Sequence, residues 1–274
     1  MRLVARATSA LAIQLLSKRC HSTAQIANTI SNDKGRLRLH EEKYCDDLST
    51  PFKQPYRGIL ETLSKKTESE FRNSHMMVSQ TQAKLLHQLV AILRPQRILE
   101  IGGFTGYSAI AMGSALMAKA KLLSLELDPK HIKIAEKYVN IAQLQDKIQF
   151  RQGPAIDSLD YLGQTNPSNM KYDLIFLDAD KGGYINYFES ILKYDLLSDQ
   201  GVIVADNVLF FGQVHKEAGY IDQTKGKADE EAASKNVKKT ALKVHTFNQH
   251  VANDSRVESV MLPLFDGLTI IRKK

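Results

Sequence analysis

The chain has little cysteine and no tryptophan: two cysteines occur in 274 residues. Cys20 and Cys45 are too few for a disulfide framework and lack the spacing of a zinc site, so we predict free thiols in a reducing compartment. No apolar run approaches the roughly 20 residues that a membrane-spanning helix needs, so no transmembrane span is expected. No internal repeat or low-complexity block follows residue 35.

Acidic residues are absent from residues 1–32, where arginine, lysine, serine and threonine are interspersed with aliphatic residues. This composition is typical of a mitochondrial transit peptide. The alternatives are a disordered tail and a secretory signal whose apolar centre would be residues 10–16. We therefore predict that residues 1–34 are a transit peptide or a disordered tail, and that the protein is mitochondrial or otherwise cytoplasmic.

Net positive charge is scarce outside this end of the chain. Residues 1–40 carry a net charge of +6, out of +7 for the whole chain. The nearly neutral remainder does not support a nucleic-acid surface, which weighs against an enzyme that acts on RNA. With 43% hydrophobic and 24% charged residues, the composition suits a globular protein. We predict a single domain over residues 35–274.

Short apolar segments alternate with helical patterns through the middle of the chain. Two helices, at 53–68 and 79–93, are expected first. Strands are predicted at 97–101, 121–126, 147–151, 172–177 and 201–205, with helices at 107–117, 129–142, about 154–162 and about 183–194 between them. Strands separated by helices in this way form parallel sheets that are buried on both faces. The pattern predicts an α/β fold.

The C-terminal pattern differs. After a polar stretch at 208–233 and a helix near 241–251, two strands are predicted at 256–262 and 268–272. They are joined across 263–267, where the Asp266-Gly267 pair is a strong turn signal. An antiparallel hairpin should therefore close the otherwise parallel sheet.

Ligands of open parallel sheets bind beyond the carboxyl ends of the strands. The first predicted strand runs into Gly102, Gly103 and Gly106, which would let a ligand approach the backbone closely. Glu126 ends the second strand, where an acid can accept hydrogen bonds from a ribose diol. These features do not distinguish NAD from S-adenosylmethionine, and the glycines alone also fit an ordinary tight turn.

Two later strand ends carry oxygen ligands. Asp178 follows the fourth strand, and Asp206 and Asn207 follow the fifth. Two carboxylates and an amide at one edge of the sheet suit Mg²⁺ or a similar cation. The alternative is that these residues cap helices.

Several motifs together resemble one family, the cation-dependent O-methyltransferases of the caffeoyl-CoA and catechol type. They are LEIGGFTGYSAIA (99–111), SLELD (124–128), FRQGPA (150–155), YDLIFLDADKGGYINYFE (172–189), VADNVLF (204–210) and LPLFDGLTI (262–270). The resemblance implies a Rossmann-like class I methyltransferase sheet, mostly parallel with a C-terminal antiparallel hairpin and helices on both faces. It also implies a homodimer.

The resemblance assigns roles to individual residues. Asp178, Asp206 and Asn207 match metal ligands, and Lys181 matches the general base. The positions that match S-adenosylmethionine contacts are Val78, Glu100, Gly102, Gly103, Ser108, Glu126, Ala155 and Asp180.

These roles predict methylation of one hydroxyl of a catechol-like, caffeoyl-type diol. A divalent cation, Mg²⁺ by preference, would bind both hydroxyls and stabilise the oxyanion, and Lys181 would accept the proton. Phe210, Phe211 and Tyr184 are candidates for an aromatic wall, although each could be an ordinary packing residue. Many relatives have tryptophan at Phe210, and the 211–236 segment has no assigned role. An NAD-dependent oxidoreductase and a non-catalytic binding protein are the alternative functions.

Overall fold

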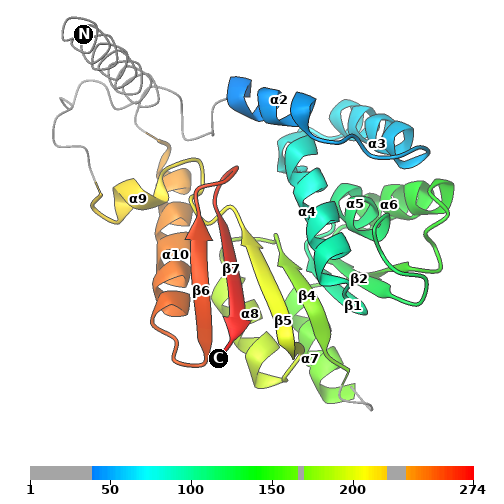
Figure 1. Ribbon diagram of the computed structural model, residues 1–274. Coiled ribbons are helices and arrows are strands. Elements are labelled where there is room, and N and C mark those ends of the chain that lie inside the picture. The colour runs from blue at the N-terminus through cyan, green and yellow to red at the C-terminus, as the bar shows by residue number, and fades with distance from the viewer. Residues whose placement is uncertain (1–38, 166–169, 221–232) are drawn as a thin grey trace, which may run out of the picture.

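The structure is a computed structural model that describes residues 39–165, 170–220 and 233–274. The predicted transit peptide or tail at 1–34, and Cys20 with it, lie outside the described residues. Cys45 is an exposed free thiol, as predicted. One seven-stranded sheet, in the order β3-β2-β1-β4-β5-β7-β6, forms the centre of the molecule (Figure 1).

The first five strands are parallel to one another, and the last two strands form an antiparallel pair. β1 (Arg97–Ile101) lies between β2 (Lys121–Glu126) and β4 (Tyr172–Leu177), while β3 (Ile148–Gln152) pairs with β2, and β5 (Leu197–Asp206) pairs with β4. β7 (Leu268–Lys273) runs antiparallel to both β5 and β6 (Val257–Leu262). The predicted parallel sheet with a C-terminal hairpin is confirmed.

Helices cover both faces of this sheet (Figure 1). On one face lie α3 (Tyr56–Glu70), α4 (Gln80–Leu93), α5 (Tyr107–Gly113) and α6 (Pro129–Ile141). On the other lie α7 (Ala155–Thr165), α8 (Tyr184–Lys193) and α10 (Lys235–Ala252). Each face has its own core because successive strand side chains point to opposite sides: Ile98 packs under the first helix layer and Leu99 under the second.

Local sequence explains where several helices begin. Ser79 accepts a hydrogen bond from the backbone N–H of Gln82 and caps α4, and Asp128 accepts one from Lys130 and caps α6. Pro129 occupies the first turn of α6, as predicted, where the proline's missing N–H costs no hydrogen bond.

Some elements differ from the prediction. α2 (Leu39–Leu48) was not predicted, nor was the short helix α9 (Val214–Glu217) within the polar stretch. α5 ends at Gly113, before the predicted 117, because consecutive backbone turns follow it from Ala115 to Ala120. β5 begins at Leu197, four residues before its predicted start, because Leu197 pairs with Tyr172 before the ladder shifts register and resumes where Val202 pairs with Leu174. Among the described helices, none is long and apolar enough to span a membrane.

Candidate active site

The carboxyl ends of β1, β4 and β5 stop level with one another at one edge of the sheet. Ile101 pairs with Leu177, and Leu177 pairs with Ala205. The residues that follow these pairs, Gly102, Asp178 and Asp206, are therefore adjacent in space. This register brings together three of the strand ends at which ligand-binding residues are predicted.

Asp206, at the end of β5, is buried, with 2% of its surface exposed. Its carboxylate accepts hydrogen bonds from Gln82 Nε2 at 2.7 Å and from the backbone N–H of Asn207 at 2.7 Å. Burial first, and then the nearby Asp178 carboxylate, raise the pKa of Asp206 to about 7, while Lys181 opposes the shift. Two acids thus share a poorly solvated space, where a cation would be favourable.

Lys181 completes this group, which we call the β4–β5 cluster: Asp178, Lys181, Asp206 and Asn207. Its Nζ donates to Asp178 Oδ1 at 3.0 Å and to the Tyr184 hydroxyl at 2.5 Å. The lysine side chain is only 11% exposed, so its amine is held against these two partners.

Tyr184 does not form part of an aromatic wall. Its side chain is fully buried and packs edge-on against Phe247 of α10, with ring centroids 5.2 Å apart. Burial raises the pKa of Tyr184 well above its ordinary value, and neighbouring carboxylates raise it further. Of the two roles left open for this residue, the structure supports the packing role, because Tyr184 begins α8, whose apolar face packs against the sheet.

Asp180 lies beside the β4–β5 cluster but is held separately. Its Oδ1 accepts a hydrogen bond from the Tyr187 hydroxyl at 2.5 Å. Burial raises the pKa of Tyr187, and the hydrogen bond to Asp180 raises it further. Tyr184 and Tyr187, one helical turn apart on α8, therefore hold neighbouring residues of the loop after β4.

A second group, the β1–β2 cluster, consists of Glu100, Ser108, Ser124 and Glu126. Glu100 is fully buried and accepts hydrogen bonds from Ser108 Oγ at 2.6 Å and Ser124 Oγ at 2.5 Å. Burial raises its pKa to about 7, although both serine hydrogen bonds lower it. Glu100 and Ser108, both predicted as cofactor residues, are therefore hydrogen bonded to each other.

Glu126 is hydrogen bonded by the protein on both oxygens. Its Oε2 accepts from the backbone N–H of Phe104 at 2.8 Å, and its Oε1 accepts from that of Asp128 at 2.9 Å. His131 Nδ1 lies 3.0 Å from Oε1. A carboxylate offers about four acceptor sites, so capacity for a further donor remains. The His131 ring packs edge-on against Phe104, at a centroid distance of 4.6 Å.

The two predicted glycines are required by the protein's own packing. Gly102 has φ +98°, and a Cβ there would overlap the carbonyl of Asp178. A Cβ on Gly103 would overlap the Ser124 hydroxyl. Glycine at these positions lets the ends of β1, β2 and β4 approach closely, whether or not a ligand is bound.

The other two predicted cofactor residues lie on the two sides of this edge. Val78, 8% exposed, directly precedes Ser79, which caps α4. Ala155 begins α7, immediately after β3 and the Gly153-Pro154 turn. Both therefore sit at helix starts close to strand ends.

The loop after β5 rests on the turn of the C-terminal hairpin. The backbone N–H of Leu209 donates to the Asp266 carbonyl at 2.9 Å, and that of Phe211 donates to Asp266 Oδ1 at 2.6 Å. Phe210 and Phe211 adopt positive φ angles, with ring centroids 4.9 Å apart, and Phe211 is 37% exposed. The hairpin therefore sets where these two aromatic side chains lie.

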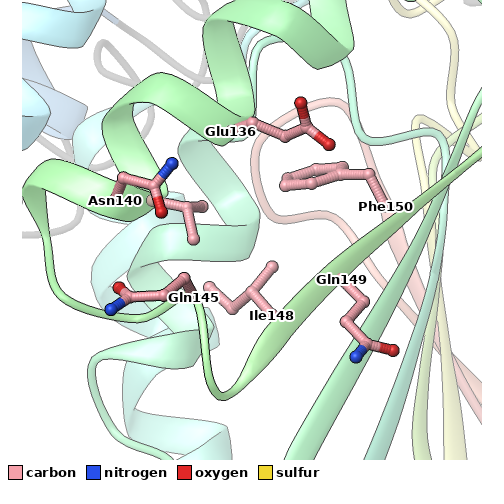
Figure 2. Close-up of a pocket in the computed structure, with 7 residues that line it drawn as sticks. Glu136, Asn140, Gln145, Ile148, Gln149 and Phe150 are labelled. Carbon is pink, nitrogen blue, oxygen red and sulfur yellow. The ribbon is translucent and has the colours of Figure 1, made fainter.

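Two surface pockets lie away from these clusters. One, of about 360 Å³, lies between α6 and the amino-terminal half of β3 and includes Glu136 and Phe150 (Figure 2). The other, of about 500 Å³, lies between α3 and α6. Neither is lined by a predicted site residue, and their lining is mainly apolar and amide side chains.

Several contacts at the site were not anticipated from the sequence. Gln82 reaches Asp206 from 124 residues away, and His131 contacts Glu126. Ser124 offered a signal, because it is a polar residue within an apolar strand. Tyr187 offered none, since its spacing from Tyr184 is that of any amphipathic helix.

The family model for O-methyltransferases matches residues 53–274. The chain belongs to the O-methyltransferase family. Caffeoyl-CoA O-methyltransferase 2 of Eucalyptus globulus is 34% identical over 229 residues, covering 80% of this chain and 87% of the relative. Caffeoyl-CoA O-methyltransferase 5 of Nicotiana tabacum is 32% identical, with 80% and 90% coverage.

Solved structures agree with this membership. The SAH-bound methyltransferase PaMTH1 of Podospora anserina has a TM-score of 0.73 at 28% identity, covering 86% of this chain and 94% of that one. An O-methyltransferase of Bacillus cereus in complex with SAH has a TM-score of 0.68 at 28% identity, with 86% and 97% coverage. The fold is thus the Rossmann-like methyltransferase fold, and the enzyme is an S-adenosylmethionine-dependent O-methyltransferase of the caffeoyl-CoA type. Membership in this family overturns the NAD-dependent alternative.

Proposed function

We propose that this enzyme methylates one hydroxyl of a catechol-like, caffeoyl-type diol and uses a divalent cation, Mg²⁺ by preference. The observation that carries the proposal is the β4–β5 cluster, where two carboxylates from adjacent strand ends face a single lysine. The relatives that are named caffeoyl-CoA O-methyltransferases support the substrate class.

The donor set fits such a cation. Asp178, Asp206 and Asn207 offer hard oxygen ligands, which Mg²⁺ prefers. Burial first, and then the neighbouring Asp178 carboxylate, raise the pKa of Asp206 to about 7, so a cation held beside these two acids would be favourable. When bound, the cation would supply charge stabilisation for a deprotonated substrate hydroxyl.

Within this proposal Lys181 is the general base. Its Nζ lies 3.0 Å from Asp178 Oδ1, so the amine is held beside a proposed metal ligand. A neutral amine at this place could accept the proton of the hydroxyl to be methylated. Fixing the nucleophile next to the methyl donor can contribute about 7–11 kcal/mol of barrier reduction in favourable cases.

The S-adenosylmethionine site is proposed along the β1–β2 cluster and the flanking loops. Glu126 would accept hydrogen bonds from the ribose, with its remaining acceptor capacity. The further proposed contacts are Val78, Glu100, Gly102, Gly103, Ser108, Ala155 and Asp180. Phe210 and Phe211 are proposed to contact the aromatic ring of the diol.

Three properties of the whole protein belong to the same proposal. Residues 35–274 would form the single methyltransferase domain, and the enzyme would act as a homodimer. The acid-free segment at 1–32 supports mitochondrial targeting, with a cytoplasmic location as the alternative. A reporter fused to residues 1–35 would test the targeting, and a purely cytosolic signal would contradict it.

The function is tested with a panel of catechols and their thioesters, labelled S-adenosylmethionine and Mg²⁺. We expect methylated product from at least one diol, none from the matching monophenols, and loss of turnover in chelator that added Mg²⁺ restores. Lys181→Ala should reduce turnover to a small residual rate while the binding of SAH is retained. Full activity in chelator would contradict the metal mechanism.

A further inference from the structure

A single buried hydroxyl connects the main parts of the β4–β5 cluster. The Tyr184 oxygen lies 3.2 Å from the carbonyl of Leu177, at the end of β4, and 3.0 Å from the carbonyl of Asp206, at the end of β5. It also lies 2.5 Å from Lys181 Nζ. Leu177 directly precedes Asp178, so the hydroxyl touches both strand ends that carry the proposed metal ligands.

The hydrogen-bonding capacity of a phenol fixes the direction of these contacts. Carbonyl oxygens can only accept, so the one proton of Tyr184 is shared between Leu177 and Asp206. The hydroxyl oxygen is then left to accept from Lys181. The lysine consequently has two fixed acceptors, Asp178 and Tyr184, which together determine where its amine lies.

The tyrosine ring is in turn rigidly placed. It is fully buried, packs on Phe247, and lies 4.7 Å from Lys181 Nζ at its centroid. A side chain enclosed in this way has no alternative rotamer without opening the core. Tyr184 is therefore held in place by α8 and α10, and its hydroxyl restricts the movement of the two strand ends that it contacts.

We propose that Tyr184 is a positioning residue for the methyl transfer: its hydroxyl orients the Lys181 amine and fixes the spacing between the β4 and β5 ends. The proposal rests on the proposed roles of Lys181 as base and of Asp178 and Asp206 as metal ligands. Tyr184 itself would not contact the substrate, because its side chain has no exposed surface.

The test is Tyr184→Phe, which removes the hydroxyl and keeps the ring. We expect kcat to fall by about 10- to 100-fold, the cost of a misplaced catalytic group. The affinity for Mn²⁺, measured by calorimetry in the absence of substrate, should fall by about 10-fold or more. The KM for S-adenosylmethionine and the affinity for SAH should stay within about twofold, because no proposed cofactor residue contacts this hydroxyl.

Two matched variants make the result specific. Tyr172→Phe removes a largely buried hydroxyl from the opposite end of β4, and it should leave kcat and Mn²⁺ affinity unchanged. Tyr187→Phe removes the hydroxyl that contacts Asp180, so it should weaken SAH binding and leave Mn²⁺ affinity unchanged. A merely structural loss at Tyr184 would instead lower SAH and Mn²⁺ binding together, in step with the stability of the variant.

A double-mutant cycle with Lys181→Met tests whether Tyr184 acts through the lysine. If it does, adding Tyr184→Phe to Lys181→Met should cause little further loss of the residual kcat, although Mn²⁺ affinity should still fall. Fully additive losses in kcat would overturn the proposed orientation of the amine.

A second substitution covers the case in which Tyr184→Phe does not fold. A ring-fluorinated tyrosine, placed at Tyr184 by codon suppression, keeps the volume and the hydroxyl but makes its oxygen a weaker acceptor. We expect a lower kcat with unchanged Mn²⁺ affinity. An unchanged kcat would overturn the proposal for the lysine, and unchanged Mn²⁺ affinity in Tyr184→Phe would overturn it for the strand ends.

Failure of the proposed function is distinguishable from failure of this inference. If the unaltered enzyme neither binds Mn²⁺ nor methylates any diol, the proposed function is wrong, and the roles assigned to Tyr184 are wrong with it. If the unaltered enzyme does both and Tyr184→Phe matches it, only the inference about Tyr184 is overturned.

Discussion

The β1–β2 cluster and the β4–β5 cluster lie at the same edge of one sheet, but the acids of the two clusters have different partners. In the first, Glu100 and Glu126 are hydrogen bonded by serine hydroxyls, backbone N–H groups and His131. In the second, Asp206 is buried and close enough to Asp178 for that carboxylate to raise its pKa, while Lys181 contacts Asp178 and lowers the pKa of Asp206.

This difference agrees with the ligand that we propose for each cluster. Serine hydroxyls and backbone N–H groups, which carry no charge, donate to the acids of the β1–β2 cluster, as suits the ribose site that we propose. In the β4–β5 cluster two carboxyl groups share a poorly solvated place, which would favour the proposed cation. Variants that affect one cluster and spare the other will test the division.

The largest effect is expected from Asp206→Asn. The change removes a proposed metal ligand, so turnover and Mg²⁺ affinity should each fall by more than about 100-fold. SAH affinity, measured by calorimetry, should stay within about threefold of the original value, because the β1–β2 cluster is intact.

Asp173→Asn provides the control for Asp206→Asn. Asp173 accepts backbone hydrogen bonds from Gln96 and Arg97 at the opposite end of the sheet. Its loss should leave turnover and both affinities unchanged. Equal loss of SAH and Mg²⁺ binding in Asp206→Asn would show that the two clusters do not act separately.

Gly102→Ala should damage both clusters, because Gly102 lies where they meet. The added Cβ would overlap the Asp178 carbonyl, and the φ of +98° is unfavourable for alanine. We expect the free energy of unfolding to fall by at least about 2 kcal/mol, measured with urea. Gly219→Ala is the matched control: its φ is +85°, but nothing lies within 4 Å of the added Cβ. The two variants should differ, and equal losses would mean that backbone strain alone is responsible.

Glu100→Gln should change how stability depends on pH. Burial raises the pKa of Glu100 from 4.5 to about 7, so the folded protein keeps a proton there that the unfolded chain releases. The contribution of Glu100 to the free energy of unfolding therefore decreases as pH rises from 4.5 to about 7, and is constant above that. In urea unfolding without metal, the original protein should lose stability relative to Glu100→Gln over this window. Parallel curves would contradict the assignment.

The smallest effect is expected from His131→Phe. This change keeps an aromatic ring against Phe104 and removes the contact to Glu126. SAH affinity should fall by about fivefold, which corresponds to about 1 kcal/mol, the value of one hydrogen bond. Mg²⁺ affinity should not change, and a calorimetric titration of both ligands would check this. A loss confined to Mg²⁺ would contradict the separation of the clusters.

The sequence predicted the order of strands and helices well, because this signal is local. The bounds of β1, β2 and β4 agree with those predicted, since apolar runs between helical segments are unambiguous there. The edge at which Asp178, Asp206 and Asn207 meet also followed from the sequence, because parallel strands present their carboxyl ends together. Elements without an apolar pattern, such as α9, were missed.

The sequence by itself determined which residue types follow each strand, since the positions of the strand ends and the alternation of side chains along a strand are local properties of the chain. Only the tertiary structure decided what each of them touches. Gln82 meets Asp206 and Tyr184 lies in the core because helices from distant parts of the chain pack across the strand ends. Such contacts depend on the distance and direction of side chains after folding, which residue spacing along the chain does not specify.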